Sequence, residues 1–403
     1  MPDKIRKKII ITPHGELKTP FFMPDATRGY VKSVSTDDLE RVGVGAMVVN
    51  TLHLYLEPGM NIIRKIPSSL SLASGERPSL SLAGGESPAK GGQVVVRVGK
   101  GIHSFMNWHR PLLSDSGGFQ VFSLIHKNPK MGEITDKGAV FKSPLDGSLH
   151  NLTPEKSINI QFDLGVDMMV CLDDCPPNGY DKSKLEISVA RTIKWAKRCK
   201  VEYEKQIKKR KIKDLDRPLI FSVIQGGNEK DLRKYCADEL IKIGFDGYGF
   251  GARPVDEYGN WLEDILIYTA NLIPKDSLRF ALGIGLPEDI LRCAFYGWDM
   301  FDCVIPTREA RHGKLFFWNN NFQFSIFSLQ KKKKFYKTIN INNSKFSKDF
   351  SPINENSKLP ELRNHTKAYL RHLFKMKEPL GARLASLNNL EFYMELMEKI
   401  NLL

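Results

Sequence analysis

Short apolar runs, each ending in a polar residue or a glycine, recur along the chain. Stretches with the apolar spacing of amphipathic helices separate the later runs, at 183–208, 230–243 and 261–273. Buried parallel strands that alternate with helices produce this pattern. The predicted strands are 21–25, 46–51, 111–115, 168–174, 219–225, 248–252, 280–285 and 300–306.

We predict an α/β fold, a (β/α)8 TIM barrel, because eight such strands fit a closed barrel better than a doubly wound sheet. A doubly wound sheet would also need a glycine-rich dinucleotide turn after an early strand, which the sequence lacks. The predicted catalytic barrel spans 1–312. The remainder, 313–403, forms a predicted C-terminal subdomain whose helices, at 366–374 and 387–400, pack on the barrel.

Residues 69–88 form an imperfect tandem repeat of two ten-residue units, SLSLASGERP and SLSLAGGESP. The repeat is rich in Ser, Gly and Pro and has no large side chain to bury. We therefore predict a low-complexity surface insertion at about 66–98 that has no fixed structure.

The chain has 403 residues, with 60 Lys and Arg against 46 Asp and Glu, and a formal net charge of +14. This excess favours a polyanionic partner, of which nucleic acid is the commonest. The six cysteines include no CxxC pair, and the sequence has neither a signal peptide nor a long apolar run. We therefore expect a soluble cytoplasmic protein with reduced thiols and no membrane partner.

Polar residues and glycines follow the predicted strands. In a (β/α)8 barrel, the residues at the C-terminal ends of the strands converge on one face and form the active site. Carboxylates in one pocket suit glycosyl transfer, in which one acid attacks the anomeric carbon and another handles the proton of the leaving group. The strand-end residues are Asn50, Asp115, Asp173, Asp174, Gln225, Gly251, Gly283, Gly285 and Asp302.

Asp302 lies inside an apolar run and is followed closely by Arg308 and Arg311. A carboxylate among apolar side chains is costly unless it is paired or used in function. Arginines suit phosphate oxygens, which they bind bidentately. Two interpretations stay open from these residues alone: a nucleophile beside a phosphate clamp, or a strand acid that forms a salt bridge with Arg308.

Several long motifs lie at or near the predicted strand ends. They include SDSGGFQVFSL (114–124), LDDCPP (172–177), VIQGG (223–227), GFDGYGFG (244–251) and DMFDCVIPTREAR (299–311). These motifs resemble those of tRNA-guanine transglycosylases, also called queuine tRNA-ribosyltransferases, of the bacterial type. The resemblance covers nearly the whole chain apart from the repeat and a later segment rich in Asn, Lys and Phe.

The resemblance implies a base exchange in tRNAs with a GUN anticodon. Asp302 would be the nucleophile that attacks the anomeric carbon of the guanosine at the first anticodon position, and Asp115 the proton acceptor and acid/base. By similarity, the substrate-binding residues are Asp115, Phe119, Asp173, Gln225, Ala252 and Leu282. The RNA-binding residues are Gly283, Ile284, Gly285, Leu286, Pro287, Glu288, Asp289, Thr307, Arg308, Glu309, Ala310 and Arg311.

Smaller features point to the incoming base. Cys175 and Val255 match bacterial members, which use 7-aminomethyl-7-deazaguanine in queuosine biosynthesis, although ordinary strand-end packing also explains them. Glu257 stands where bacterial members have an acid that pairs with the ammonium group of this base. The family usually forms homodimers, so a homodimer is expected here.

The chain departs from the family at its structural zinc site. Ser357, Leu359, Leu362 and Asn388 stand where the family has three cysteines and a histidine. Zinc needs nitrogen, sulfur or oxygen ligands, and leucine has none. We predict no zinc and no other cofactor, with Leu359 and Leu362 packing against the C-terminal helix instead.

A second departure is the segment GARPVDE (251–257), which stands where the family has GGLAVGE. Ala252 adds a methyl group and Pro254 lacks an N–H donor, in a loop that binds the incoming base in the family. We expect a narrowed or reshaped pocket. Asp25 and Glu57 replace the usual Val and Arg, and the sequence offers no physical reason for either.

The leading hypothesis is an active transglycosylase. The main alternative is a non-catalytic relative that binds tRNA or supports a partner subunit, which the missing zinc ligands and the altered loop favour. The presence of Asp115, Asp173 and Asp302 favours the enzyme, because a binding module has no use for a nucleophile. A barrel glycosidase that acts on free carbohydrate explains neither the charge nor the motifs.

Overall fold

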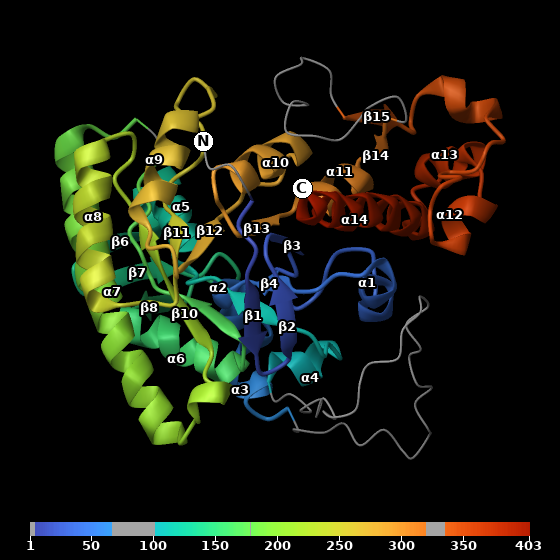
Figure 1. Cartoon of the computed structure of the whole chain (residues 1–403). Coiled ribbons are helices and arrows are strands. Elements are labelled where there is room, and N and C mark those ends of the chain that lie inside the picture. The colour runs from blue at the N-terminus through green and yellow to red at the C-terminus, as the bar shows by residue number, and fades with distance from the viewer. Residues whose placement is uncertain (1–4, 67–100, 178, 320–334) are drawn as a thin grey trace, which may run out of the picture.

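The computed structural model describes residues 5–66, 101–177, 179–319 and 335–403. Within them, parallel strands form an eight-stranded sheet in the order β3-β13-β12-β11-β10-β9-β5-β4 (Figure 1). Every predicted strand coincides with or overlaps an observed one. The strands are β3 (Phe21–Pro24), β4 (Met47–Val49), β5 (Leu112–Ser114), β9 (Met168–Val170), β10 (Leu219–Ile224), β11 (Gly247–Phe250), β12 (Leu278–Ala281) and β13 (Met300–Cys303).

The two outer strands of this sheet, β3 and β4, meet and close it into a barrel. Asp25, which follows β3, forms a parallel bridge with Val48 of β4. The backbone N–H of Ala26 donates to the carbonyl of Val48 at 2.7 Å, and that of Asn50 donates to the carbonyl of Thr27 at 3.2 Å. The predicted (β/α)8 barrel is therefore confirmed, and the doubly wound alternative is excluded.

Apolar side chains fill the interior of the barrel. Met23, Phe221 and Phe280 belong to this inner cluster, whereas the other faces of the strands pack against the helices. A hairpin of β1 (Ile9–Thr12) and β2 (Gly15–Lys18), which was not predicted, adds Ile10 and Leu17 to the inner cluster. Because apolar side chains fill the barrel interior, a cavity for a ligand has to lie at one end of the barrel.

Helices surround the barrel (Figure 1). The three helices predicted within the barrel are confirmed as α7, α8 and α9, each within two residues of its predicted ends, and those predicted at 366–374 and 387–400 correspond to α13 (Lys367–Lys375) and α14 (Pro379–Leu402). In the described part of the chain, no helix is long and apolar enough to cross a membrane. The helices up to the end of the barrel are α1 (Thr36–Val42), α2 (Thr51–Leu54), α3 (Met60–Ile63), α4 (Ile102–Met106), α5 (Gly118–Lys127), α6 (Pro154–Leu164), α7 (Lys182–Arg210), α8 (Lys230–Ile243), α9 (Glu263–Leu272), α10 (Pro287–Phe295) and α11 (Ile305–Arg311).

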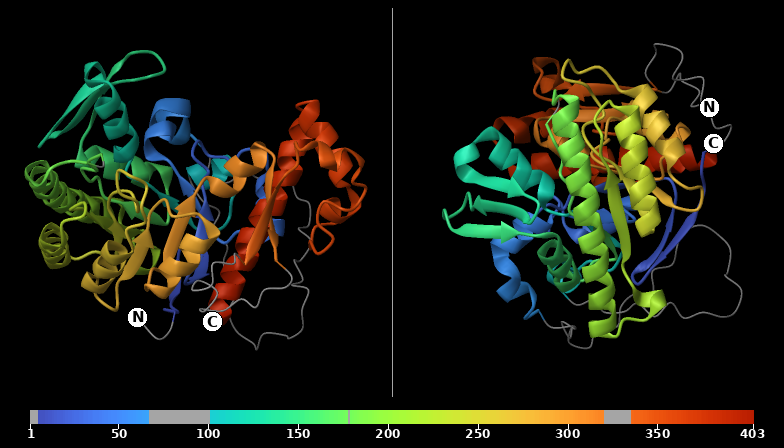
Figure 2. Two further views of the ribbon diagram at one scale, coloured as in Figure 1. Left: turned by 90° about the horizontal axis from the view of Figure 1, so that it is seen from above. Right: turned by 90° about the vertical axis from the view of Figure 1, so that its left-hand side faces the viewer.

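A small antiparallel sheet interrupts the barrel between α5 and α6. It consists of β6 (Gly132–Thr135), β7 (Gly138–Lys142) and β8 (Leu149–Leu152). The sequence did not reveal it, because β6 and β8 are short and mostly exposed or half-buried. Figure 2 shows this sheet (teal) and the C-terminal elements (red) on different sides of the barrel.

The C-terminal elements follow α11, so the predicted boundary at 312 lies between α11 and β14. The helix α14 contacts α11, α1 and β3. Its Tyr393 packs on Phe22 of β3, with ring centroids 5.0 Å apart, and donates a hydrogen bond to the carbonyl of Gly285 at 2.6 Å. These elements are β14 (Lys314–Trp318), β15 (Tyr336–Asn340), α12 (Pro360–Asn364), α13 (Lys367–Lys375) and α14 (Pro379–Leu402). Almost all of the predicted insertion at 66–98 lies outside the described residues.

Candidate active site

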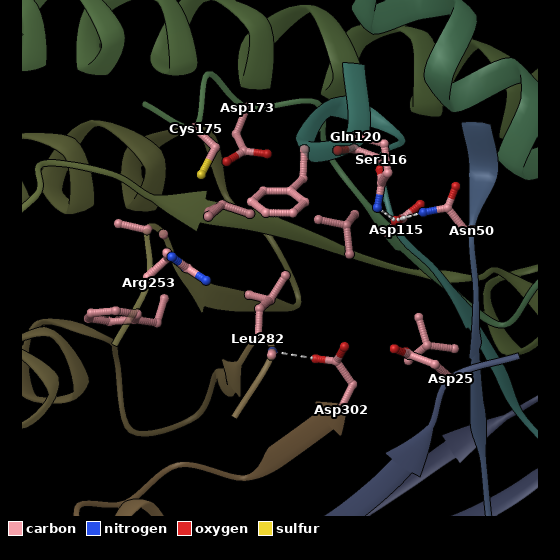
Figure 3. Close-up of a pocket in the computed structure, with 18 of the residues that line it drawn as sticks. Asp25, Asn50, Asp115, Ser116, Gln120, Asp173, Cys175, Arg253, Leu282 and Asp302 are labelled. Atoms are coloured by element: carbon pink, nitrogen blue, oxygen red, sulfur yellow. Dashed lines mark hydrogen bonds between the residues drawn. The ribbon is translucent and has the colours of Figure 1, made fainter. Parts of the chain in front are cut away.

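A cavity of about 480 Å³ opens at the C-terminal ends of the barrel strands (Figure 3). All the residues predicted to bind substrate or to catalyse line it, so the structure brings together side chains that follow six different strands. They are Asp115, Phe119, Asp173, Gln225, Ala252, Leu282 and Asp302.

Asp302 lies on β13 and reaches into the cavity (Figure 3). Its Oδ1 accepts a hydrogen bond from the backbone N–H of Gly283 at 2.9 Å. Burial raises the pKa of Asp302 to about 6, and the charge of Asp115 adds to the shift. Among the described residues Asp302 forms no ion pair with Arg308, whose guanidinium instead lies 3.6 Å from the carboxylate of Glu309. The salt-bridge interpretation of Asp302 is therefore wrong.

Asp115 follows β5 on another side of the same cavity. Burial raises its pKa to about 6, although hydrogen bonds to its carboxylate oppose the shift. Four N–H donors fix its two oxygens, which together offer about four acceptor positions. The donors are the backbone N–H of Thr51 (2.9 Å) and of Gly117 (3.1 Å), Gln120 Nε2 (3.1 Å) and Asn50 Nδ2.

Asp173 and Gln225 form a polar pair at the floor of the cavity. Gln225 Nε2 donates to Asp173 Oδ2 at 2.7 Å, whereas the buried Gln225 Oε1 has no hydrogen-bond partner among the residues that the structure describes. Burial raises the pKa of Asp173 to about 7, with smaller contributions from nearby carboxylates. Gly251 is necessary beside this pair, because a Cβ there would lie 2.5 Å from Gln225 Cδ. The pair thus offers donor and acceptor groups to a flat heterocycle.

Asp174, next in the chain, points away from the cavity. Its carboxylate pairs with Arg191 of α7, and its backbone carbonyl accepts from the Ser188 hydroxyl at 2.6 Å. Asp174 therefore anchors the loop to α7 and leaves Asp173 as the acid of this pair that lines the cavity. The strand-end pattern alone did not separate the two acids, whereas the family resemblance named Asp173 and not Asp174 as a substrate-binding residue.

Phe119 and Leu282 supply apolar surface to the cavity. Phe119 lies in the first turn of α5 and is 56% exposed, which is unusual for a ring of this size. Leu282 follows β12 and also lines the cavity. An exposed ring beside an aliphatic side chain can hold a planar base.

The loop after β11 has a strained backbone at Ala252, which the sequence analysis did not predict. Ala252 has a φ of 79°, in the left-handed region that favours glycine. Arg253 is exposed and lines the cavity, on the side away from Asp115 (Figure 3). Val255 and Glu257 line a neighbouring cavity that shares Ala252 and Arg253 with the first. We call the first cavity the base cavity. Arg253 is the cation of this loop that lines it, and the sequence analysis assigned this residue no role.

A basic cavity of about 490 Å³ adjoins the base cavity. Thr307, Arg308 and Arg311, from the predicted RNA-binding segment, line it. Arg28 and Lys32 line it too, although the sequence analysis did not single them out. Because this cavity collects four cationic side chains, it suits the phosphates of a polynucleotide.

The other residues predicted to bind RNA lie in varied surroundings. Ile284, Pro287 and Ala310 are buried, and the Glu309 carboxylate pairs with Arg308 and Lys314. Within this set, exposure favours Gly283, Leu286 and Arg308 as contacts with a large ligand. The others make internal contacts: Gly285 with Tyr393, Glu288 with Tyr336 and Asp289 with Arg292.

Asp25 is a cavity residue whose place the sequence did not explain. It follows β3 and faces Asp302 across the cavity (Figure 3). Burial and the charges of Asp302 and Asp115 raise the pKa of Asp25 well above its usual value. Its departure from the family was visible in the sequence, but its proximity to Asp302 depends on the pairing of β3 with β13.

The positions that correspond to the zinc ligands of the family lie around α14 and do not fit a zinc ion. Leu359 and Leu362 are 4% and 0% exposed and belong to the main apolar core. The Ser357 hydroxyl donates to Glu391, and the Asn388 amide donates to a carbonyl of β14 at 3.0 Å. Two of the four side chains have no ligand atom, and the polar pair already has protein partners.

Known proteins resemble this chain over almost its whole length. The sequence model of the queuine tRNA-ribosyltransferase family matches residues 3–90 and 87–401. The queuine tRNA-ribosyltransferase of Halothermothrix orenii is 39% identical over 389 residues, which are 96% of this chain and 87% of that protein. The proteins of the same name from Caldanaerobacter subterraneus and Staphylococcus haemolyticus are 39% and 34% identical, each over 98% of this chain and 89% and 88% of their own. The chain therefore belongs to the queuine tRNA-ribosyltransferases, a family of pentosyltransferases that modify tRNA.

Proposed function

We propose that this protein exchanges the guanine at the first anticodon position of GUN-anticodon tRNAs for 7-aminomethyl-7-deazaguanine, through a covalent ribosyl intermediate on Asp302. One observation carries the proposal: Asp302 and Asp115 line one cavity of base size that adjoins a strongly basic cavity. The proposed nucleophile, the proposed acid/base and the proposed phosphate site thus line two adjoining cavities.

In the first step, the Asp302 carboxylate attacks C1′ of the guanosine, and the bond from C1′ to the guanine nitrogen breaks. The bonding electrons stay on guanine, and Asp115, protonated at the start of this step, gives its proton to the ring nitrogen as the base leaves. In the second step, Asp115 takes a proton from the incoming base, whose ring nitrogen attacks C1′ and releases Asp302. Both steps use the same two carboxyl groups.

The base is held by its edge and by its faces. Asp173 and Gln225 meet the polar edge of the ring with one acid and one amide, and the unpartnered Gln225 Oε1 accepts a donor from the base. Phe119 and Leu282 pack on the ring. The target base has to leave the anticodon stack to reach this cavity, which costs unstacking free energy that these contacts offset.

The anticodon phosphates bind Arg308 and Arg311, with Arg28 and Lys32 close by. The protein acts as a homodimer, as is expected for this family. Catalysis needs no zinc and no other cofactor, because every group that the two steps use is a side chain of this chain.

The test is exchange of labelled guanine into a GUN-anticodon tRNA. We expect incorporation by the wild type and none by Asp302→Ala, with tRNA binding and melting temperature retained. Asp231→Ala, a surface aspartate on α8, is the matched control and should exchange normally. A wild type that binds tRNA but never incorporates label would instead indicate the non-catalytic alternative.

A further inference from the structure

The base cavity and the basic cavity share a short wall. Only Asp25, Thr27 and Val304 are common to the linings of both. A nucleotide with its base in one cavity and its phosphates in the other has to place its ribose along this wall. Of these three described residues, Asp25 alone has an ionisable side chain, and in Figure 3 it faces Asp302, the proposed nucleophile.

Among the described residues, no hydrogen bond or ion pair holds the carboxyl group of Asp25, in contrast to Asp115 with its four donors and Asp173 with its glutamine. A partly buried carboxyl group without partners is costly unless a ligand satisfies it. The Asp25 carboxyl group is therefore available to a ligand at the place where the attacked ribose would lie.

We propose that Asp25 binds the 2′-hydroxyl of the ribose that Asp302 attacks, and thereby makes the protein selective for a ribonucleotide at the target position. The inference rests on the proposed function, since it presupposes attack on a nucleotide. The 2′-hydroxyl lies on the carbon next to C1′, so a contact there also orients C1′ toward Asp302. It is also the group by which a protein distinguishes RNA from DNA.

The protonation state of Asp25 fits this role. Burial and the charges of Asp302 and Asp115 raise the pKa of Asp25 well above its usual value, which favours the protonated carboxyl group. A neutral carboxyl group can accept a hydrogen bond from the 2′-hydroxyl through one oxygen and donate from the other. It also avoids placing a second negative charge beside the nucleophile.

The test combines two substrates with three forms of the protein. The substrates are anticodon stem-loops whose target guanosine carries either a ribose or a 2′-deoxyribose. The proteins are the wild type, Asp25→Asn and Asp25→Val, and the readout is kcat/KM for guanine exchange on each substrate. Cys175→Ala, which alters the base side of the same cavity, is the control.

We expect the wild type to prefer the ribose substrate by about tenfold or more, because the deoxy analogue leaves the Asp25 carboxyl group without a hydrogen-bond partner. Asp25→Asn, whose amide also donates and accepts, should keep most of this preference. Asp25→Val should abolish it by slowing the ribose substrate alone, and Cys175→Ala should leave the ratio unchanged.

A wild type that does not distinguish the two sugars would overturn the inference, as would an Asp25→Val protein with an unchanged ratio. In both cases exchange itself would still be observed, so the proposed function would stand. If Asp25→Val fails to fold, the wild-type ratio and the Asp25→Asn protein still decide. Loss of exchange by the wild type on both substrates would refute the proposed function, and the inference with it.

Discussion

The carboxyl groups of Asp115 and Asp302 line one cavity, and burial raises the pKa of each to about 6. A nucleophile has to be ionised, so protonation of Asp302 removes the attacking group. We predict that kcat/KM for base exchange falls as the pH drops below about 6, where Asp302 takes up a proton, and falls again well above it, where Asp115 has lost the proton that it donates. A rate profile between pH 5 and 8 measures this, with tRNA affinity measured at each pH as the control. A flat profile across pH 6 would contradict the assignment.

The strand-end pattern and the motifs located the cavity residues correctly, since Asp115, Asp173 and Asp302 line one cavity as predicted. They could not show which polar neighbours orient these acids. The donor Gln120 reaches Asp115 from the next helix, and Asp25 reaches the cavity because of a strand pairing far away in the sequence. Such contacts depend on tertiary register, which periodicity does not encode.

The loop after β11 lines the base cavity and contains a strained backbone position. Ala252 occupies a left-handed conformation that glycine adopts without a Cβ clash. Replacing Ala252 by Gly should therefore raise the free energy of unfolding by about 1 kcal/mol, as measured by urea denaturation. Ala196→Gly, in the middle of α7, is the matched control and should lower it by about 1 kcal/mol. Destabilisation by Ala252→Gly would mean that this backbone is not strained.

Elements buried on both faces were predicted well, because their apolar runs are continuous. The strand β9 has this pattern, and so do its neighbours in the barrel. The strands β6 and β8 were missed, since short, half-exposed strands have neither long apolar runs nor clear alternation. The hairpin of β1 and β2 was missed for the same reason, although β2 buries Leu17 in the barrel.

The helix α12 carries Leu362, which is fully buried where the family binds zinc. If packing holds this region together, Leu362→Ala should lower the free energy of unfolding by about 2–5 kcal/mol. Leu402→Ala, at an 84% exposed site, should change it by less than about 0.5 kcal/mol. Metal analysis of the purified protein should find no stoichiometric zinc. Stoichiometric zinc, or a melting temperature that chelators lower, would contradict this account.

The whole molecule carries a net charge of +14, and the basic cavity concentrates part of it beside the catalytic groups. Each cation that neutralises an RNA phosphate releases counterions, so tRNA affinity should fall as salt rises. Arg311→Ala should weaken binding and reduce the slope of log affinity against log salt by about 1. Lys242→Ala, at the far end of α8, should change neither quantity. An unchanged slope for Arg311→Ala would place the phosphates elsewhere.

In the proposed mechanism the barrel positions Asp302 to attack the sugar, and covalent attachment of RNA to Asp302 tests this claim most directly. An anticodon stem-loop incubated with the protein and then denatured should leave a ribosyl adduct, and mass spectrometry of peptides should locate it on Asp302. The adduct should be absent from Asp302→Asn and should disappear when free guanine is added before denaturation. An adduct on any other residue, or exchange by Asp302→Asn at the wild-type rate, would contradict the account.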